Sequence, residues 1–181
     1  MHESASLPTL PPPFRSLLRP LPLLPLQLVL GRMVTHLGRR RPGIFTRLGT
    51  HADKVYLIDA TDLPFAFRLR PQPERPVLEV CRREKAGPWQ VRIAGSLAAL
   101  LGMIHGSLDG DALFFSRDLL VEGDTEAVLA LRNALDDAEI DLLSEAAGAL
   151  GPAGPAMEGA MRRVLAEASR LSGFALLRAG S

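Results

Sequence analysis

Apolar residues in the first part of the chain recur at helical intervals. They occur at Leu23, Leu26, Leu30, Val34 and Leu37. This spacing predicts a helix that starts near Pro25, because a proline in a first turn lacks only an N–H that would have no partner there. We expect the helix to end at Gly38 and a short helical turn to follow over residues 44–48.

Beyond His51 the pattern changes to that of β-strands. Four strand-sized apolar segments are bounded by Asp, Pro or Gly, at residues 55–60, 65–69, 77–81 and 89–93. Their uninterrupted succession predicts an antiparallel meander. An apolar helix over residues 97–105 and a fifth strand over residues 113–121 should follow.

Helical spacing returns after Asp124, which is a good N-cap. We expect one helix from there, a second over residues 140–149, and a terminal amphipathic helix after a Gly-Pro linker. The predicted class is therefore α+β, with a curved, mainly antiparallel sheet of about five strands and helices packed on it. The expected divisions are a Pro-rich tail (1–19), a basic, apolar helical arm (20–50), a main domain (51–150), and the linker with its helix (151–181).

Charge is divided unevenly along the chain. Residues 1–50 contain seven arginines and one glutamate, whereas the rest contains 14 basic and 19 acidic residues, so the two parts carry +6 and −5. The first helix could therefore lie on an anionic membrane. Its contacts would be Leu24 and Leu28 with the lipid and Arg39, Arg40 and Arg41 with the headgroups. The alternative is that this helix packs on its own domain or on a second copy.

The acidic part of the chain disfavours one class of partner. Residues 109–145 contain eleven acidic residues and two arginines. This balance argues against nucleic-acid binding through that region. It indicates either a solvated helical face or a docking surface for a basic partner.

Cysteine content and the apolar segment near the N-terminus bear on location. Cys81 is the single cysteine, so an internal disulfide and a thiolate zinc site are excluded. Residues 17–30 begin beside Arg15 and Arg19, as the apolar part of a signal peptide would, but prolines interrupt them and no cleavage site follows. They are also too short for a membrane span of about 20 apolar residues. We expect a cytoplasmic protein, at most peripheral at the inner membrane.

Few side chains suit catalysis or metal binding. The best cluster is His105 with Asp109 and Asp111, which lies across an expected Asp-Gly turn and has no metal-ligand spacing. Ser116 lies beside Arg117 and Asp118 but lacks a glycine elbow, and no phosphate-binding loop is present. We therefore expect neither catalysis nor a cofactor or metal.

One block resembles a known family, the sterol-carrier-protein-2 (SCP2) domains. It runs from Gly95 to Asp124 and reads GSLAALLGMIHGSLDGD-ALFFSRDLLVEGD. In that family a strand leads through a short apolar helix to another strand, a Gly-Asp turn and a helix. The continuation over residues 125–142, TEAVLALRNALDDAEIDL, resembles the UbiT branch, the accessory factors of oxygen-independent ubiquinone biosynthesis. The resemblance is strong over residues 91–142 and weaker over 55–81.

The resemblance implies an apolar tunnel between helices and sheet, and no catalytic residue. It implies binding of an isoprenoid-tailed quinone precursor or another lipid, and partnership with the paired iron–sulfur hydroxylase proteins of that route. The residues available to line the tunnel are Leu97, Leu100, Leu101, Met103, Ile104, Phe114, Phe115, Leu131, Met157 and Met161. Taken singly, each fits ordinary core better than ligand contact, because the sequence pattern is the same for a filled core and a tunnel.

Three hypotheses remain at this point. The first is a lipid-binding accessory factor. The second is a membrane-associated scaffold that assembles biosynthetic enzymes without binding lipid itself. The third is an enzyme that acts on a lipid through His105 and Asp109.

Overall fold

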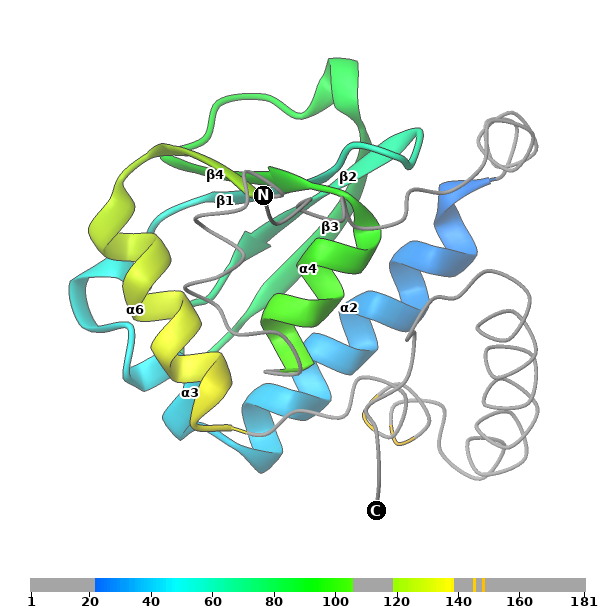
Figure 1. The fold of residues 1–181 in the computed structure, drawn as a ribbon. Helices are drawn as coiled ribbons and strands as arrows, with labels where there is room; N and C mark the ends of the chain where they lie inside the picture. Colours follow the sequence, from blue (N-terminus) through cyan, green and yellow to red (C-terminus); the bar gives the residue numbers. More distant parts are fainter. Residues whose placement is uncertain (1–21, 106–118, 139–144, 146–147, 149–181) are drawn as a thin grey trace.

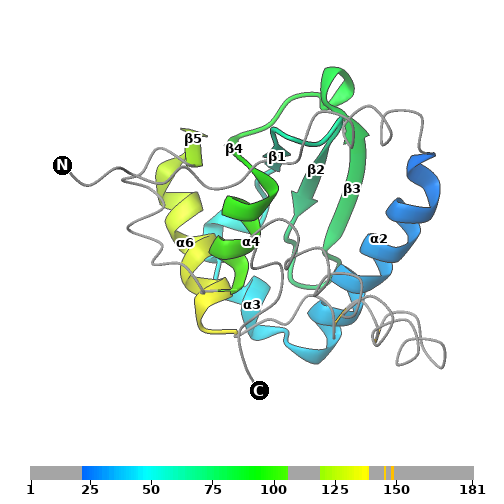
Figure 2. The same ribbon diagram turned by 45° about the vertical axis from the view of Figure 1, so that its right-hand side comes forward.

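The sheet at the centre of the molecule has five strands in the order β3-β2-β1-β4-β5 (Figure 1). The computed structural model describes residues 22–105, 119–138, 145 and 148. Its strands are β1 (Tyr56–Ala60), β2 (Phe65–Arg70), β3 (Val77–Arg82), β4 (Val91–Gly95) and β5 (Leu119–Gly123). Its helices are α2 (Leu23–Arg40), α3 (Gly43–Thr46), α4 (Leu97–His105) and α6 (Thr125–Asp136), with 3-10 turns η1 (Gly49–His51) and η2 (Arg83–Lys85). The α-helices share one face of the sheet, as Figures 1 and 2 show from two directions.

The predicted α+β class and five-stranded, mainly antiparallel sheet are confirmed, but the predicted meander is wrong at β4. β1, β2 and β3 pair antiparallel in sequence order, as do β4 and β5. β4, however, lies parallel to β1 on the side away from β2, with Tyr56 opposite Val91 and Ala60 opposite Gly95. The chain must therefore cross the sheet between β3 and β4, which a meander would not require.

The crossing segment covers the face of the sheet opposite the helices. Ala86 and Trp89, from the connection between β3 and β4, form a small apolar cluster there with Leu57, Ala66 and Cys81. Burying this second face stabilises the crossing, because apolar side chains leave water on both sides of β1 and β2. The position of Trp89 in this cluster also explains why β4 starts two residues later than the pattern predicted.

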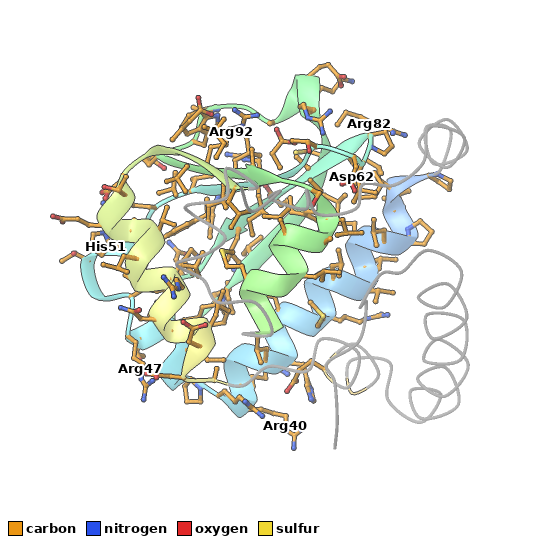
Figure 3. All side chains as sticks on the ribbon, in the orientation of Figure 1. Arg40, Arg47, His51, Asp62, Arg82 and Arg92 are labelled. Carbon is orange, nitrogen blue, oxygen red and sulfur yellow. The ribbon has the colours of Figure 1, made fainter. Side chains whose placement is uncertain are left out.

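A buried aspartate on β1 holds the crossing segment in place. Asp59 is 1% exposed, and its two oxygens bind Arg83 Nε at 2.7 Å and Arg92 Nη2 at 2.6 Å. Arg83 also donates to the carbonyls of Ala60 (3.0 Å) and Leu63 (2.9 Å). Arg92, labelled in Figure 3, lies on β4, so one carboxylate joins β1, β4 and the start of the crossing. Burial opposes ionisation of Asp59, but the hydrogen bonds from Arg92 and Arg83 outweigh it and lower its pKa.

Helix α2 is longer than predicted, and the expected stop at Gly38 is wrong. The helix continues to Arg40, and Gly38 is buried inside it. A Cβ at this position would lie 2.8 Å from Pro76 Cγ and 3.3 Å from the ring of Phe45. Gly38 therefore permits close approach of α2 to the segment before β3, where the sequence pattern had suggested a C-cap.

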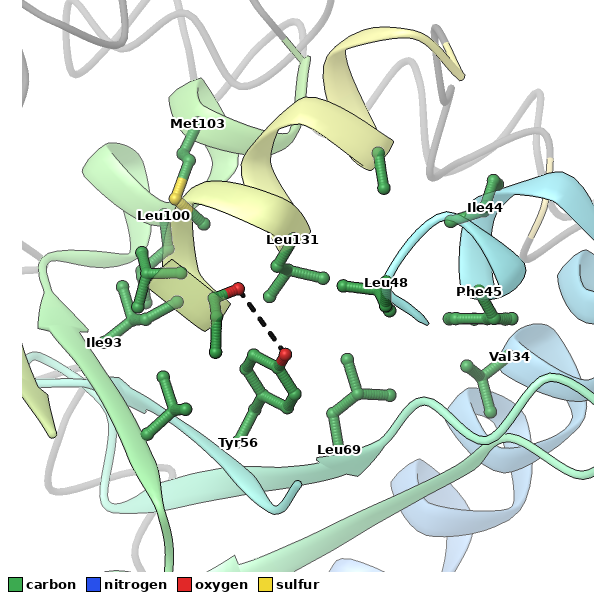
Figure 4. Close-up of a cluster of buried hydrophobic side chains, with 14 of the residues drawn as sticks. Val34, Ile44, Phe45, Leu48, Tyr56, Leu69, Ile93, Leu100, Met103 and Leu131 are labelled. Carbon is green, nitrogen blue, oxygen red and sulfur yellow. Dashed lines mark hydrogen bonds between the residues drawn. The ribbon is translucent and has the colours of Figure 1, made fainter. Parts of the chain in front are cut away.

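The main core lies between the helices and the sheet, and Tyr56 is at its centre (Figure 4). Its side chain is fully buried, and its hydroxyl lies 3.0 Å from the carbonyl of His51 and 3.4 Å from that of Ala127. Burial, together with the charge of Asp124, raises the pKa of Tyr56 to about 12. The phenol therefore stays protonated and able to donate to these carbonyls.

The N-cap predicted at Asp124 is confirmed, because its carboxylate accepts a hydrogen bond from Ala127 N at 3.0 Å. Lys54 also binds this carboxylate. The hydrogen bond from Lys54 lowers the pKa of Asp124 most, and the hydrogen bond from Ala127 N lowers it further. The helix of residues 97–105 is likewise found where the pattern placed it. The predicted tail, the strand over 113–118 and most of the predicted helices after residue 139 lie outside the described residues.

We expect Asp59→Asn to destabilise the fold by about 3 kcal/mol, because two arginines would lose their buried counter-charge. Folding lowers the pKa of Asp59 from its ordinary value, so the stabilisation is present above the ordinary aspartate pKa and is lost as the pH falls through the lowered pKa. Urea unfolding at pH 7 and at pH 3 checks both statements. The wild type should lose more stability than the variant between these pH values, and equal losses would contradict the assignment.

Candidate ligand-binding surface

Two side chains fix where α4 begins, and α4 carries most of the described residues that the sequence nominated for ligand binding. Ser96 Oγ accepts from Ala99 N at 3.2 Å, and Asp62 Oδ1 accepts from Leu97 N at 2.8 Å. Both acceptors are buried, with Asp62 3% exposed. They satisfy N–H groups that the first turn of a helix leaves without intrahelical partners.

The nominated residues of α4 divide between two faces. Leu100 and Met103 are buried, and they belong to the same core cluster as Leu131 of α6. Leu97 and Leu101, one turn apart, are half-buried. Leu97 packs against that cluster, so its outer part borders the core without being enclosed by it.

The other residues that the sequence nominated for ligand binding lie outside the described part of the chain. The backbone of Ile104 is helical, but its side chain is not described. Phe114, Phe115, Met157 and Met161 fall in the ranges 106–118 and 149–181. The same holds for Asp109 and Asp111, and for the side chain of His105. Within the described residues, no group of three or more His, Cys, Asp or Glu side chains could hold a metal ion.

A row of sheet residues that the sequence did not single out is the best candidate for ligand contact. Ile58, Phe67 and Val80 are directly opposite one another on β1, β2 and β3, and all three are half-buried. We call these three residues the apolar floor. The next residue of the row, Ile93 on β4, is 1% exposed. The three floor residues are therefore more exposed than their neighbour on β4.

The arrangement of the helices explains why the floor residues are less buried than Ile93. α2 packs mainly on β3, whereas α4 packs on β4 and α6. β1 and β2 lie between these contacts, so the apolar floor is bordered by a helix on either side (Figure 2). Tyr56 and Leu69 form the next pair on the same face of β1 and β2. Leu48 and its neighbours cover this pair, so the apolar floor is closed at this end of the strands (Figure 4).

The chemistry of the apolar floor suits a hydrocarbon chain. Its three side chains have no hydrogen-bonding group, and Phe65 adds a second ring, edge-on to Phe67 at 5.7 Å between ring centroids. On this face of β1–β3, Arg82 is the one charged residue, and it lies opposite Phe65 at the end of the strands. A ligand on the floor would therefore bury apolar surface there and place its polar head elsewhere.

The hollows found in the described part of the chain differ in character from the apolar floor. One, of about 500 Å³, lies along α2, and another, of about 680 Å³, lies between α2 and residues 73–78; both include Gln27, Gly31, Thr35 and Arg39. They are open and partly lined by arginine, whereas the floor is closed on one side by the core. We consider the floor the better ligand surface because burial of apolar area is what a lipid requires.

The residues nominated for membrane contact lie on α2 and just after it. Leu24 is 73% exposed and Leu28 56%, and the side chains of Arg39 and Arg40 are also exposed. Arg41 is engaged within the chain, since it donates to the carbonyl of Ala138 and lies 3.9 Å from Glu145. None of the described helices is long and apolar enough to cross a membrane.

A model of the SCP-2 sterol transfer family matches residues 34–136, more than half of the chain. No curated protein matches. Among solved structures, the "UbiJ-SCP2 Ubiquinone synthesis protein" is 23% identical with a TM-score of 0.51, over 67% of this chain and 98% of that one.

Two further solved structures are similar at lower scores. Sterol Carrier Protein 2 from Yarrowia lipolytica is 14% identical, covering 60% of this chain and 88% of its own, with a TM-score of 0.41. The sterol carrier protein domain 2 of Helicoverpa armigera is 13% identical, covering 60% and 87%, with a TM-score of 0.43.

We expect truncation in the core and on the floor to have different effects on stability. Leu131→Ala should cost about 3 kcal/mol, because a cavity would remain among fully buried neighbours. Phe67→Ala should cost less, because its ring is half-buried and water can fill the space. Urea unfolding of the two variants measures this difference, and an equal or larger loss for Phe67→Ala would show that the floor is ordinary core.

Proposed function

The chain belongs to the SCP-2 sterol transfer family, and from this premise we propose that it is a non-catalytic accessory factor that binds the apolar chain of a lipid. The observation that carries the proposal is the half-buried row Ile58, Phe67 and Val80, which lies between α2 and α4. A packed core normally covers apolar strand residues that face the helices.

The energy of the proposed contact comes from apolar burial. Each methylene moved from water to the floor contributes about 0.8 kcal/mol, so a long chain gains affinity from length rather than from any single polar contact. The half-buried Leu26 of α2 and Leu97 of α4 would supply the two sides. The floor therefore selects for a long apolar tail and leaves the choice of head group to residues outside it.

The finer proposal is that the lipid is an isoprenoid-tailed quinone precursor and that the protein supports ubiquinone synthesis without oxygen. Two observations support it: the resemblance of residues 125–142 to the UbiT branch, and the fold shared with a solved ubiquinone synthesis protein. The partners would be the iron–sulfur hydroxylase pair of that route. No residue is assigned to catalysis, because an accessory factor presents its lipid to these enzymes.

The direct test is lipid extraction from the purified full-length protein, followed by mass spectrometry. Isoprenoid-tailed lipid should co-purify with the wild type and fall about tenfold in Phe67→Trp and in Leu101→Trp, because added bulk displaces the chain. Leu129→Trp is the matched control, since Leu129 is 54% exposed on α6. Lipid-free wild type, or equal lipid in all variants, would contradict the proposal.

The pathway is tested separately by ubiquinone content in a strain that lacks the gene, grown with and without oxygen. Loss only without oxygen is expected. Unchanged quinone in both conditions would overturn the pathway while leaving lipid binding intact. The scaffold alternative predicts that the Phe67→Trp variant still pulls down the hydroxylase proteins. It also predicts that this variant restores quinone in the strain that lacks the gene.

Contact with an anionic membrane surface is a further part of the proposal, and the exposure of Leu24 and Leu28 supports it. Arg39 and Arg40 would supply charge, because Arg41 is held by Ala138 and Glu145. Each arginine near an anionic surface contributes about 1 kcal/mol.

We therefore expect Leu24→Glu/Leu28→Glu to reduce sedimentation with phosphatidylglycerol-containing vesicles by at least about tenfold. Leu129→Glu, which adds the same charge on an exposed residue of α6, should reduce it much less. Equal losses would place the contact elsewhere.

A further inference from the structure

The two halves of α2 are held very differently. All four of its buried residues, Met33, Val34, Leu37 and Gly38, lie in the C-terminal half. Residues 23–32 include no buried side chain, and the helix starts without a side-chain cap at Pro22. The C-terminal half is therefore part of the core, whereas the N-terminal half rests on it through half-buried leucines.

One side chain supplies the long-range hydrogen bonds of the N-terminal half. Gln27 Nε2 donates to the carbonyl of Leu78 at 2.8 Å, and Gln27 Oε1 accepts from Val80 N. The carboxamide thus replaces the partner that β3 lacks as the edge strand of the sheet. Within the described residues, no other side chain of 23–32 makes a hydrogen bond to a distant part of the chain.

This anchor lies at the end of the apolar floor. Val80, whose N–H binds Gln27, is itself a floor residue, and Leu23 and Leu26 pack against the same cluster. A chain lying across Ile58 and Phe67 toward the β3 edge would therefore meet the N-terminal half of α2. The hollow of about 680 Å³ beside Gln27, Gly31 and Leu78 leaves room next to the anchor.

Gly31 lies at the junction of the two halves, and packing does not require a glycine there. A Cβ at this position would lie 3.6 Å from Gln27 Nε2 and 4.0 Å from the carbonyl of Leu78, which are ordinary contacts. Gly38 differs, because a Cβ there would clash with Pro76. Glycine within a helix lowers its stability and leaves the backbone freer to bend.

We propose that lipid enters and leaves the apolar floor between α2 and β3, and that Gln27 is the positioning residue that holds this side closed. The N-terminal half of α2 moves outward about Gly31 when the Gln27 hydrogen bonds break. Water can then solvate Leu78 O and Val80 N at the sheet edge, so opening leaves no buried group without a partner. The inference rests on the proposed lipid-binding function and adds a route and a controlling residue to it.

Stopped-flow fluorescence of the full-length protein with dansyl-labelled undecanoic acid tests the inference. Gln27→Leu removes both hydrogen bonds and should raise the uptake and release rates about tenfold, with a smaller change in affinity. Gly31→Ala stiffens the junction and should lower both rates about threefold. Gln90→Leu is the matched control, because Gln90 Oε1 likewise accepts a backbone hydrogen bond, from Val55 N at 2.8 Å, away from α2.

The outcomes separate the inference from the proposed function. If the probe binds but its uptake and release rates are unchanged in both Gln27→Leu and Gly31→Ala, the proposed entry route is overturned. The lipid-binding function would stand in that case. Faster rates in Gln90→Leu to the same extent would also overturn it, since general loosening would then explain the effect. Absence of probe binding by the wild type would overturn the lipid-binding function and the inference together. Should Gln27→Leu fail to fold, Gln27→Glu, which keeps the acceptor but loses the donor, replaces it.

Discussion

The ion pairs of Asp59 with Arg83 and Arg92 determine where β4 lies, and the rest of the molecule depends on that position. A carboxylate that is 1% exposed needs its counter-charges close by, because an unpaired buried charge is very unfavourable. Asp59 therefore draws the start of the crossing and β4 toward β1. The parallel pairing of β1 with β4 then places α4 and α6 on the same face of the sheet as α2 but toward the opposite edge.

That separation of the helices creates the candidate surface. If β4 followed β3 at the sheet edge, the helix after β4 would pack beside α2 and far from β1. In the observed order, β1 and β2 lie between the helix contacts, and the row Ile58, Phe67 and Val80 is left half-buried. The polar network on one face of the sheet thus determines the apolar surface on the other, through strand order alone.

Helix α2 connects this surface to the outside of the molecule. Its C-terminal half is fixed by the core and by the close approach of Gly38 to Pro76. Its N-terminal half has half-buried leucines facing inward and exposed Leu24 and Leu28 facing outward. A segment that is apolar on both sides and anchored by one carboxamide is well suited to lie between a lipid site and a membrane, because neither environment penalises its side chains.

The sequence by itself determined the local elements. Strand periodicity predicted β1, β2 and β3 nearly to the residue. The apolar run over 97–105 predicted α4, and Asp124 marked the start of α6. These predictions succeed because caps and periodicity depend on neighbouring residues. The order of these elements indicated the α+β class, and the family resemblance indicated the lipid hypothesis. Only the tertiary structure decided that β4 pairs with β1, that Gly38 continues a helix, and that Gln27 binds the edge of β3. Each of these depends on contacts between residues far apart in the chain: Asp59 with Arg92, Gly38 with Pro76, and Gln27 with Val80.

The candidate floor was not predicted from the sequence, for the same reason. Ile58, Phe67 and Val80 look like any inward-facing strand residues until the strand order shows that, among the described helices, α2 packs mainly on β3 and α4 on β4, with β1 and β2 between them.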